Sequence, residues 1–185
     1  KNVDLDQLLQ DPVQVLSQHQ FAYHIPLPGQ IYLPRQNAMG WNLSHLEQQQ
    51  QLQQILQNSV TVGNQNNGNY PVMNPANKQI IASLTLNTPE QMLEALTTAH
   101  EAQPNWQRLA LVKRVELLLL LADSLERDYQ ELLNLAVKEA GKTIADSLAE
   151  IREAIDFCRY YAQQAELMFS ERHWQGRGVV LCISP

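Results

Sequence analysis

Residues 144–169 read IADSLAEIREAIDFCRYYAQQAELMF and carry the most regular apolar pattern of the chain. Apolar or small residues recur there at alternating spacings of four and three, which places them along one side of a helix. The stripe comprises Ile144, Leu148, Ile151, Ile155, Cys158, Ala162, Ala165 and Phe169. We therefore expect one helix of roughly seven turns that packs against neighbouring helices.

Three shorter helices are predicted just upstream. The first begins at Thr88-Pro89-Glu90-Gln91, which offers an N-cap, a proline at the first helical position and a capping box, and it should end before Pro104. The second covers residues 111–125 and has leucines around most of its circumference, so we expect it to be buried on most faces. The third covers residues 129–137 and should end at Gly141.

A β-hairpin is expected before these helices. Two short strands, residues 72–73 and 80–84, flank the turn Asn74-Pro75-Ala76-Asn77. A Gly/Asn loop at residues 64–69 precedes the hairpin. Before that loop, residues 43–56 are rich in glutamine, a fair helix former, which favours a solvated helix over an aggregation-prone segment.

The N-terminal region predicts little regular structure. Residues 5–9 indicate a short helix that is broken at Asp11-Pro12. Residues 24–40 contain prolines that remove backbone donors and restrict the residues before them, so an extended connector is predicted. Its apolar side chains indicate that it packs against another surface.

The C-terminal residues predict a strand and its exit. A glycine and a β-branched apolar run at 178–183 favour a buried strand, and Ser184-Pro185 favours the turn that follows it. Ligands of open α/β sheets bind just beyond the carboxyl ends of strands. Because the chain also starts at Lys1 and not at a methionine, we expect a piece of a longer α/β protein that stops where its chemistry begins.

Composition indicates an ordinary water-soluble protein. The 185 residues are 44% hydrophobic and 17% charged, and the formal net charge is −6 without a dense Lys/Arg cluster. Nucleic acid is therefore not an expected partner, because phosphate binding needs concentrated basic residues. The longest aliphatic run, residues 117–122, is far shorter than the ~20 residues of a membrane span. We expect a cytoplasmic protein.

No complete catalytic or metal set is present. Gly176 and Gly178 precede a predicted strand, which is the wrong context for a phosphate-binding loop. The histidines share no ligand spacing, so zinc is not expected; they are His19, His24, His45, His100 and His173. Cys158 and Cys182 lie in apolar contexts and are expected to be reduced, buried and not nucleophilic.

Carboxylates and basic residues alternate between residues 138 and 159. The spacing pairs Asp156 with Arg152 or with Arg159. A solvated, salt-bridged helix face explains this pattern, and a substrate entrance lined by Glu153 is the functional alternative. Composition does not separate the two.

Several motifs resemble the aldehyde dehydrogenase superfamily. Residues 138–143 (KEAGKT) and 149–162 (AEIREAIDFCRYYA) resemble its N-terminal helices. Asn74-Pro75 and Trp106 fit the same pattern, and residues 176–185 (GRGVVLCISP) resemble the strand that leads into the family's Pro-Trp-Asn turn.

The upstream residues resemble a more specific group, the bifunctional proline utilization A enzymes. In these a flavin-dependent proline dehydrogenase barrel precedes an aldehyde dehydrogenase module. The matching segments of the connector are Asp11-Pro12-Val13, Ile25-Pro26-Leu27-Pro28, Ile31-Tyr32 and Arg35-Gln36-Asn37-Ala38-Met39-Gly40. The sequence departs from the pattern of those enzymes at Gly29, Ala38 and Trp41-Asn42 and in the glutamine-rich residues 48–57.

The resemblance implies a fold and a division into parts. The parent would have the α/β fold of an aldehyde dehydrogenase, and this chain would be mostly helical with a short N-terminal hairpin and a C-terminal strand. Residues 1–57 would be the connector, and residues 58–185 the truncated N-terminal part of the NAD-binding domain.

The resemblance also implies an activity, which is NAD-dependent oxidation of glutamate semialdehyde, formed by hydrolysis of Δ1-pyrroline-5-carboxylate, to glutamate. The catalytic cysteine, glutamate and asparagine would follow Pro185, so only Ile183, Ser184 and Pro185 would contact NAD, and the FAD site would precede Lys1. The parent would be a homo-oligomer in the cytoplasm, with peripheral contact to the inner membrane as an open alternative. The chain alone should be inactive.

A second hypothesis from a different class is a standalone helical interaction module. In that case the apolar stripe of residues 144–169 would dock a partner helix. The residues encoded after Pro185 would separate the two hypotheses, because Trp-Asn-Phe-Pro supports the dehydrogenase and a stop codon supports the module.

Overall fold

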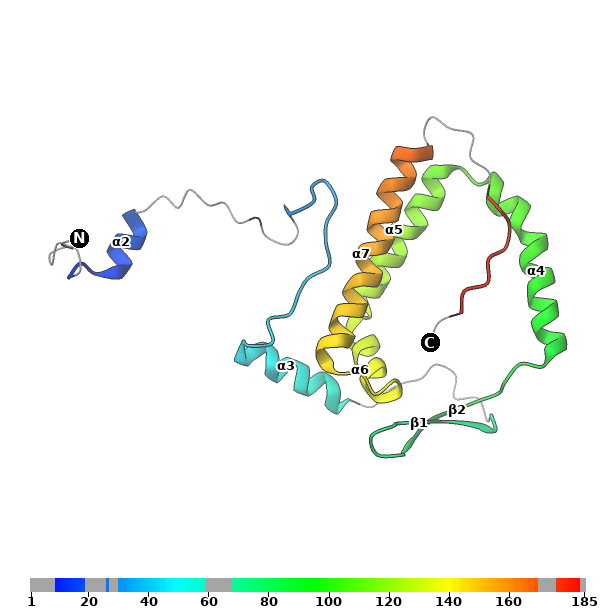
Figure 1. Ribbon diagram of the computed structural model, residues 1–185, viewed down its shortest axis with the longest axis horizontal. Helices are drawn as coiled ribbons and strands as arrows, with labels where there is room; N and C mark the ends of the chain where they lie inside the picture. The colour runs from blue at the N-terminus through cyan, green and yellow to red at the C-terminus, as the bar shows by residue number, and fades with distance from the viewer. Residues whose placement is uncertain (1–8, 19–25, 27–29, 59–67, 170–175, 184–185) are drawn as a thin grey trace, which may run out of the picture.

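The computed structural model describes residues 9–18, 26, 30–58, 68–169 and 176–183 (Figure 1). Helices dominate, and a two-stranded antiparallel sheet accompanies them. The elements are α2 (Pro12–Gln18), α3 (Leu46–Gln57), β1 (Tyr70–Met73), β2 (Ile80–Leu84), α4 (Pro89–Arg108), α5 (Leu111–Arg127), α6 (Tyr129–Glu139) and α7 (Ile144–Phe169). The predicted mostly helical fold with an early hairpin is confirmed.

The core lies between α5, α6 and α7, with α3 packed beside α6. Helix α7 runs alongside α5 in the opposite direction (Figure 1). Most of the apolar stripe of α7 is buried or half-buried as expected, with Ile155 at 0% and Ala162 at 1% exposure, whereas Phe169 at its end is 38% exposed. The buried cluster comprises Ala38, Leu52, Ile55, Ala122, Tyr129, Leu133, Leu148, Ile151 and Ile155. Each large aliphatic side chain removed from water in this way stabilises the fold by about 1.5–3 kcal/mol.

Helix α4 stands apart from the α5–α7 pair and buries no residue (Figure 1). Its start agrees with prediction, because Thr88 and Gln91 form the complete capping box. Its predicted end was wrong, since the helix continues through Pro104 to Arg108. Proline has no backbone N–H to donate to the carbonyl one turn earlier. On a helix that buries no residue, water can bind that carbonyl instead.

The hairpin and the turn after α6 meet. The strands pair as predicted, with Val72 opposite Ala82, and the turn residue Lys78 has a positive φ of 62°. Gly141 ends α6 with φ 66°, which confirms its expected place after the helix. A Cβ on Gly141 would lie 2.6 Å from Cγ of Pro75, so glycine there also permits the close approach of the hairpin.

The surroundings of two predicted segments differ from expectation. Helix α5 buries only Val115 and Ala122 fully among its residues, whereas Leu117, Leu120 and Leu121 are exposed. The predicted strand at 178–183 is not formed, since residues 176–183 have no regular secondary structure and Ile183 is 88% exposed. In both segments the apolar side chains face solvent because no other part of the described chain packs on them. Residues 178–183 also lack a neighbouring strand to supply the hydrogen bonds that a strand needs.

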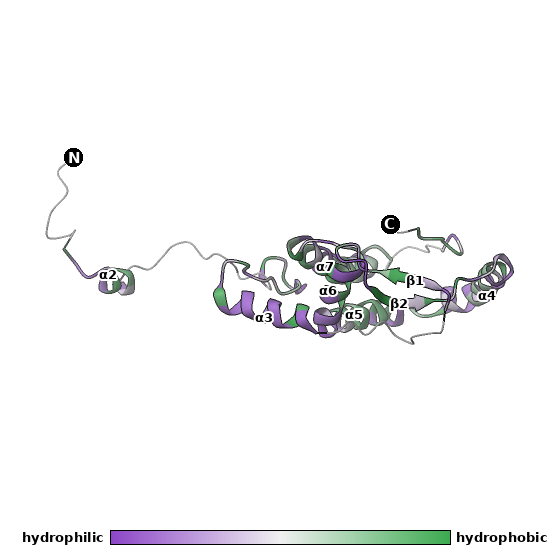
Figure 2. Cartoon of the chain, turned by 90° about the horizontal axis from the view of Figure 1, so that it is seen from below, coloured by the Kyte–Doolittle hydropathy of each residue, from purple (hydrophilic) through white to green (hydrophobic). Residues whose placement is uncertain are grey.

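The N-terminal expectations were corrected in part. The helix predicted at 5–9 lies outside the described residues. Asp11-Pro12, interpreted as a break, instead begins α2, because the Asp11 carboxylate accepts a hydrogen bond of 2.9 Å from the Val13 amide. Helix α3 forms within the glutamine-rich stretch and is largely hydrophilic on its surface (Figure 2), but it buries Leu52 and Ile55. None of the described helices combines the length and apolarity that crossing a membrane requires.

Candidate functional site

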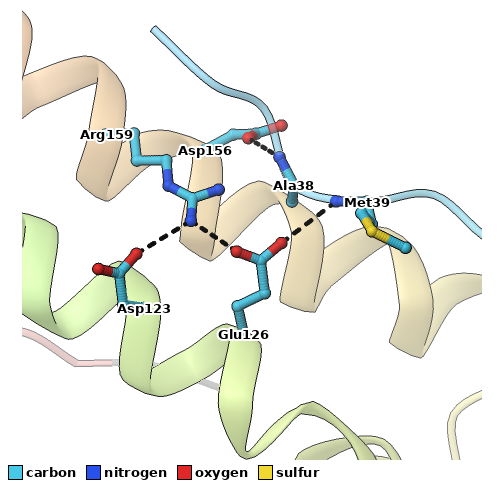
Figure 3. A network of polar contacts seen from close by, with 6 residues as sticks. All are labelled: Ala38, Met39, Asp123, Glu126, Asp156 and Arg159. Carbon is cyan, nitrogen blue, oxygen red and sulfur yellow. Dashed lines mark hydrogen bonds and ion pairs between the residues drawn. The ribbon is translucent and has the colours of Figure 1, made fainter. Parts of the chain in front are cut away.

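Arg159 is the centre of a polar network between α5 and α7 (Figure 3). Its side chain is only 9% exposed, and one guanidinium nitrogen donates to Asp123 Oδ1 at 3.1 Å and to Glu126 Oε2 at 2.6 Å. Burial acts to lower the pKa of this guanidinium, but the hydrogen bonds and charges of Glu126 and Asp123 outweigh it and raise the pKa above its usual value. Arg159 therefore stays charged and joins the two helices.

The same network holds residues 35–39, which are part of the predicted connector. The Ala38 amide donates to Asp156 Oδ1 at 2.7 Å, and the Met39 amide donates to Glu126 Oε1 at 3.4 Å (Figure 3). Upstream, the Arg35 guanidinium donates to the Asp156 carbonyl at 3.5 Å. It also lies 5.4 Å from the ring centroid of Tyr160. Residues 35–39 are thus attached to α7 and α5 by charged groups.

An aromatic pair continues this contact. The Trp41 ring stacks on Tyr129 with centroids 5.8 Å apart and an interplanar angle of 6°. Burial raises the pKa of the Tyr129 hydroxyl to about 12, and the charge of Arg152 only partly offsets this. Tyr129 is therefore a neutral packing group at ordinary pH and is no candidate for proton transfer.

The carboxylate pattern of α7 proves to be largely structural. Asp156 accepts from the Ala38 amide, and Arg159 turns across to α5, so the expected pairing of Asp156 with Arg152 or Arg159 was wrong. Spacing along one helix cannot show that an arginine beside the buried stripe finds its partners on the next helix. Glu150 pairs with Lys142. Glu153 is exposed, and the open hollow of about 360 Å³ between connector, α5 and α7 is lined by Arg35, Asp123, Arg159 and Glu166 without it.

The residues proposed to contact NAD are only partly described. Ile183 is exposed, whereas Ser184 and Pro185 lie outside the described residues, as do His19, His24 and His173. Within the described ranges no three His, Cys, Asp or Glu side chains gather as a metal site would require.

The two cysteines are unbonded. Burial raises the pKa of the Cys158 thiol, and Arg159 only partly offsets this, which is the opposite of what a nucleophile needs. Cys182 is exposed, so the expectation that both cysteines are buried was wrong for this one. Cys182 was expected inside a buried strand, and residues 176–183 do not form that strand.

Comparison with known proteins identifies the family. Residues 62–185 match the aldehyde dehydrogenase family. The chain belongs to the aldehyde dehydrogenase family. It is 32% identical to the bifunctional protein PutA of Escherichia coli over 100% of its own length and 16% of that protein. It is 34% identical to the 1-pyrroline-5-carboxylate dehydrogenase of Staphylococcus saprophyticus over 51% of this chain and 18% of the relative.

Solved structures agree with this assignment. A crystal structure of bifunctional proline utilization A superimposes with a TM-score of 0.67 and 30% identity, covering 91% of this chain and 16% of that one. The 1-pyrroline-5-carboxylate dehydrogenase of Thermus thermophilus shares the fold with a TM-score of 0.61, over 84% of this chain and 31% of that one. This aldehyde dehydrogenase segment spans 15–16% of the length of the PutA relatives.

Proposed function

We propose that this chain is a segment of a bifunctional proline-catabolic enzyme, in which a flavin-dependent dehydrogenase converts proline to Δ1-pyrroline-5-carboxylate and an NAD-dependent dehydrogenase oxidises glutamate semialdehyde to glutamate. One observation carries the proposal. The PutA relative aligns with the whole chain, connector included, whereas the single-function pyrroline-carboxylate dehydrogenase aligns with about half of it. Residues 1–61 lie outside the matched family region, and their sequence aligns with that of the bifunctional enzyme.

In this enzyme the chain would supply scaffold and one edge of the cofactor cleft. We assign residues 1–57 to the connector and residues 58–185 to the first part of the NAD-binding domain. Exposed Ile183, followed by Ser184 and Pro185, would offer an apolar edge to NAD, whose phosphates need donors from elsewhere because the chain has no phosphate-binding loop. NAD supplies the hydride acceptor when bound. No residue of this chain is assigned to FAD.

The chemistry would lie outside this chain. A nucleophilic cysteine needs a lowered pKa, and burial raises that of Cys158. Glu153 remains a proposed entrance residue, since its exposed carboxylate is free of the structural network around Arg159. We further propose a homo-oligomeric cytoplasmic enzyme, as the resemblance implies.

The interaction-module hypothesis has less support. It needs the apolar stripe of α7 to be open to a partner helix, but Leu148, Ile155 and Ala162 are already buried against this chain's own α5 and α6. The stripe on which that hypothesis rests is therefore largely occupied by this chain's own helices.

An assay of NAD reduction tests the proposal. The protein translated from the full reading frame that contains these residues should reduce NAD with Δ1-pyrroline-5-carboxylate and do so more efficiently than with an unsubstituted aliphatic aldehyde of the same length. The 185-residue chain alone should give none. Turnover by the 185-residue chain would refute its assignment as scaffold, and a full-length protein that prefers the plain aldehyde would refute the substrate.

A further inference from the structure

Residues 35–57 belong to the same core as the dehydrogenase helices, although they precede the matched family region at residue 62. Ala38 is 1% exposed, and Leu52 and Ile55 from α3 are buried in the same cluster as Leu133 and Ile155. Trp41 packs against this cluster through its stack on Tyr129. The segment therefore covers one side of the helical layer and is more than a tether.

Charged groups hold the first part of this segment in place. Its two consecutive amides, at Ala38 and Met39, donate to carboxylates from different helices, Asp156 on α7 and Glu126 on α5. Glu126 is itself held by buried Arg159, which bridges it to Asp123. The connector thus contacts both helices of a pair that Arg159 joins.

We propose that Asp156, Glu126 and Arg159 form an anchor that holds residues 35–39 on the α5–α7 pair and so fixes where any preceding part of the polypeptide meets the dehydrogenase helices. The occupant of this face is the connector of the same chain. The anchor acts on position and not on chemistry, so it holds whatever reaction the enzyme catalyses.

The physical basis is the cost of an unpaired buried donor. Ala38 is nearly inaccessible to water. Its amide therefore cannot exchange the hydrogen bond to Asp156 for one to water unless Ala38 leaves the core. An asparagine at 156 keeps a carbonyl oxygen as acceptor, whereas an alanine removes it. The pair of variants therefore separates the hydrogen bond from the size of the side chain.

Hydrogen exchange of backbone amides in the 185-residue chain tests the anchor. We expect Asp156→Ala to speed exchange at Ala38 and Met39 by about tenfold or more, the equivalent of one lost hydrogen bond to a charged acceptor. Asp156→Asn should change it much less. The amide of Ile155, buried inside α7, should keep its protection in both variants.

Arg159→Lys gives a second, milder variant, because lysine keeps the charge but its ammonium ends one bond short of the guanidinium nitrogen that contacts both carboxylates. This variant should speed exchange at Met39, the residue whose backbone amide donates to Glu126. The matched control is Arg127→Lys, since Arg127 pairs with Asp128 and forms no hydrogen bond or ion pair with the described residues 35–39.

Three outcomes would overturn the proposal. The first is an unchanged rate of amide exchange at Ala38 and Met39 in both Asp156→Ala and Arg159→Lys. The asparagine variant could lose protection as fully as the alanine variant. Exchange at Ile155 could rise as much as at Ala38, which would show general loosening and not release of the connector.

Discussion

Gly141 illustrates how a single residue can satisfy two constraints. Its φ of 66° is left-handed, and the space where a Cβ would stand is occupied by Pro75 of the hairpin turn. The sequence predicts the first constraint, because a glycine after a helical pattern is a typical end signal. The second depends on a residue 66 positions away and is visible only in the fold.

We expect Gly141→Ala to lower the free energy of unfolding by about 1–3 kcal/mol, since it adds left-handed strain and a contact with Pro75. Urea denaturation measures this change. The matched control is Gly176→Ala, whose Cβ would meet only the Gln103 side chain at 3.5 Å and should change stability by less than about 0.5 kcal/mol. Equal effects of the two substitutions would contradict the account.

Tyr129 gives a prediction about pH. Its pKa is raised to about 12 in the folded chain from an ordinary value near 10, so the fold favours the protonated form. The stability that this contributes is complete below about pH 10 and is lost as the pH rises toward 12. The loss should reach about 2 kcal/mol, after an allowance for partial solvent screening.

Tyr129→Phe keeps the stack on Trp41 and removes the titrating group. The unfolding free energy of the Tyr129 protein, measured by denaturation at several pH values, should therefore fall relative to that of Tyr129→Phe as the pH rises from 10 to 12. A difference that is constant across this window would show that the hydroxyl is not shielded by the fold.

At the level of elements, α4 differs from α7 in what holds it. Helix α7 buries its stripe, but α4 buries nothing and depends on its own hydrogen bonds and on the Thr88 capping box. Pro104 removes one of those bonds. Helix α4 should therefore open locally more often than the rest of the chain.

We expect Pro104→Ala to slow hydrogen exchange in α4 while leaving exchange in α7 unchanged. Replacement of an interior proline on an exposed helix can stabilise that helix by up to about 3 kcal/mol. Exchange measured by mass spectrometry on peptides from the two helices provides the comparison, and α7 serves as the internal control. Unchanged or faster exchange in α4 would show that proline is not its weak point.

Helix positions and the stripe of α7 could be predicted because they depend on residues close in sequence. The exposed leucines of α5 and the unformed strand at 178–183 could not, because apolar residues show that a surface is covered in some context without showing by what. The Arg159 network was also missed. Its signal was present in the spacing, since Arg159 follows Ile155 by four and lies beside the stripe, but its partners are more than 30 positions away.

At the level of the whole molecule, the chain presents much apolar surface. The exposed side chains include Met92, Leu93, Leu96, Leu117, Leu120, Leu121, Val180 and Leu181. Such area on one molecule favours association. We expect light scattering to show a mass that rises with concentration.

Replacement of Leu117, Leu120 and Leu121 by glutamate should reduce this association without loss of helicity, because all three are exposed on α5. The same substitution at Gln50, Gln53 and Gln54, exposed on α3, is the matched control and should leave association unchanged. A monomer at every concentration would contradict the expectation for the unsubstituted chain.

The most direct measurement for the central claim is formation of glutamate from proline by the protein translated from the full reading frame. The assay supplies NAD for the second step and a dye that accepts the electrons of the first. A bifunctional enzyme should form glutamate only when proline, dye and NAD are all present, with one NAD reduced for each glutamate. Reduction of NAD with pyrroline-carboxylate but no formation of glutamate from proline would contradict the account, because the connector would then join the dehydrogenase to something other than a proline dehydrogenase.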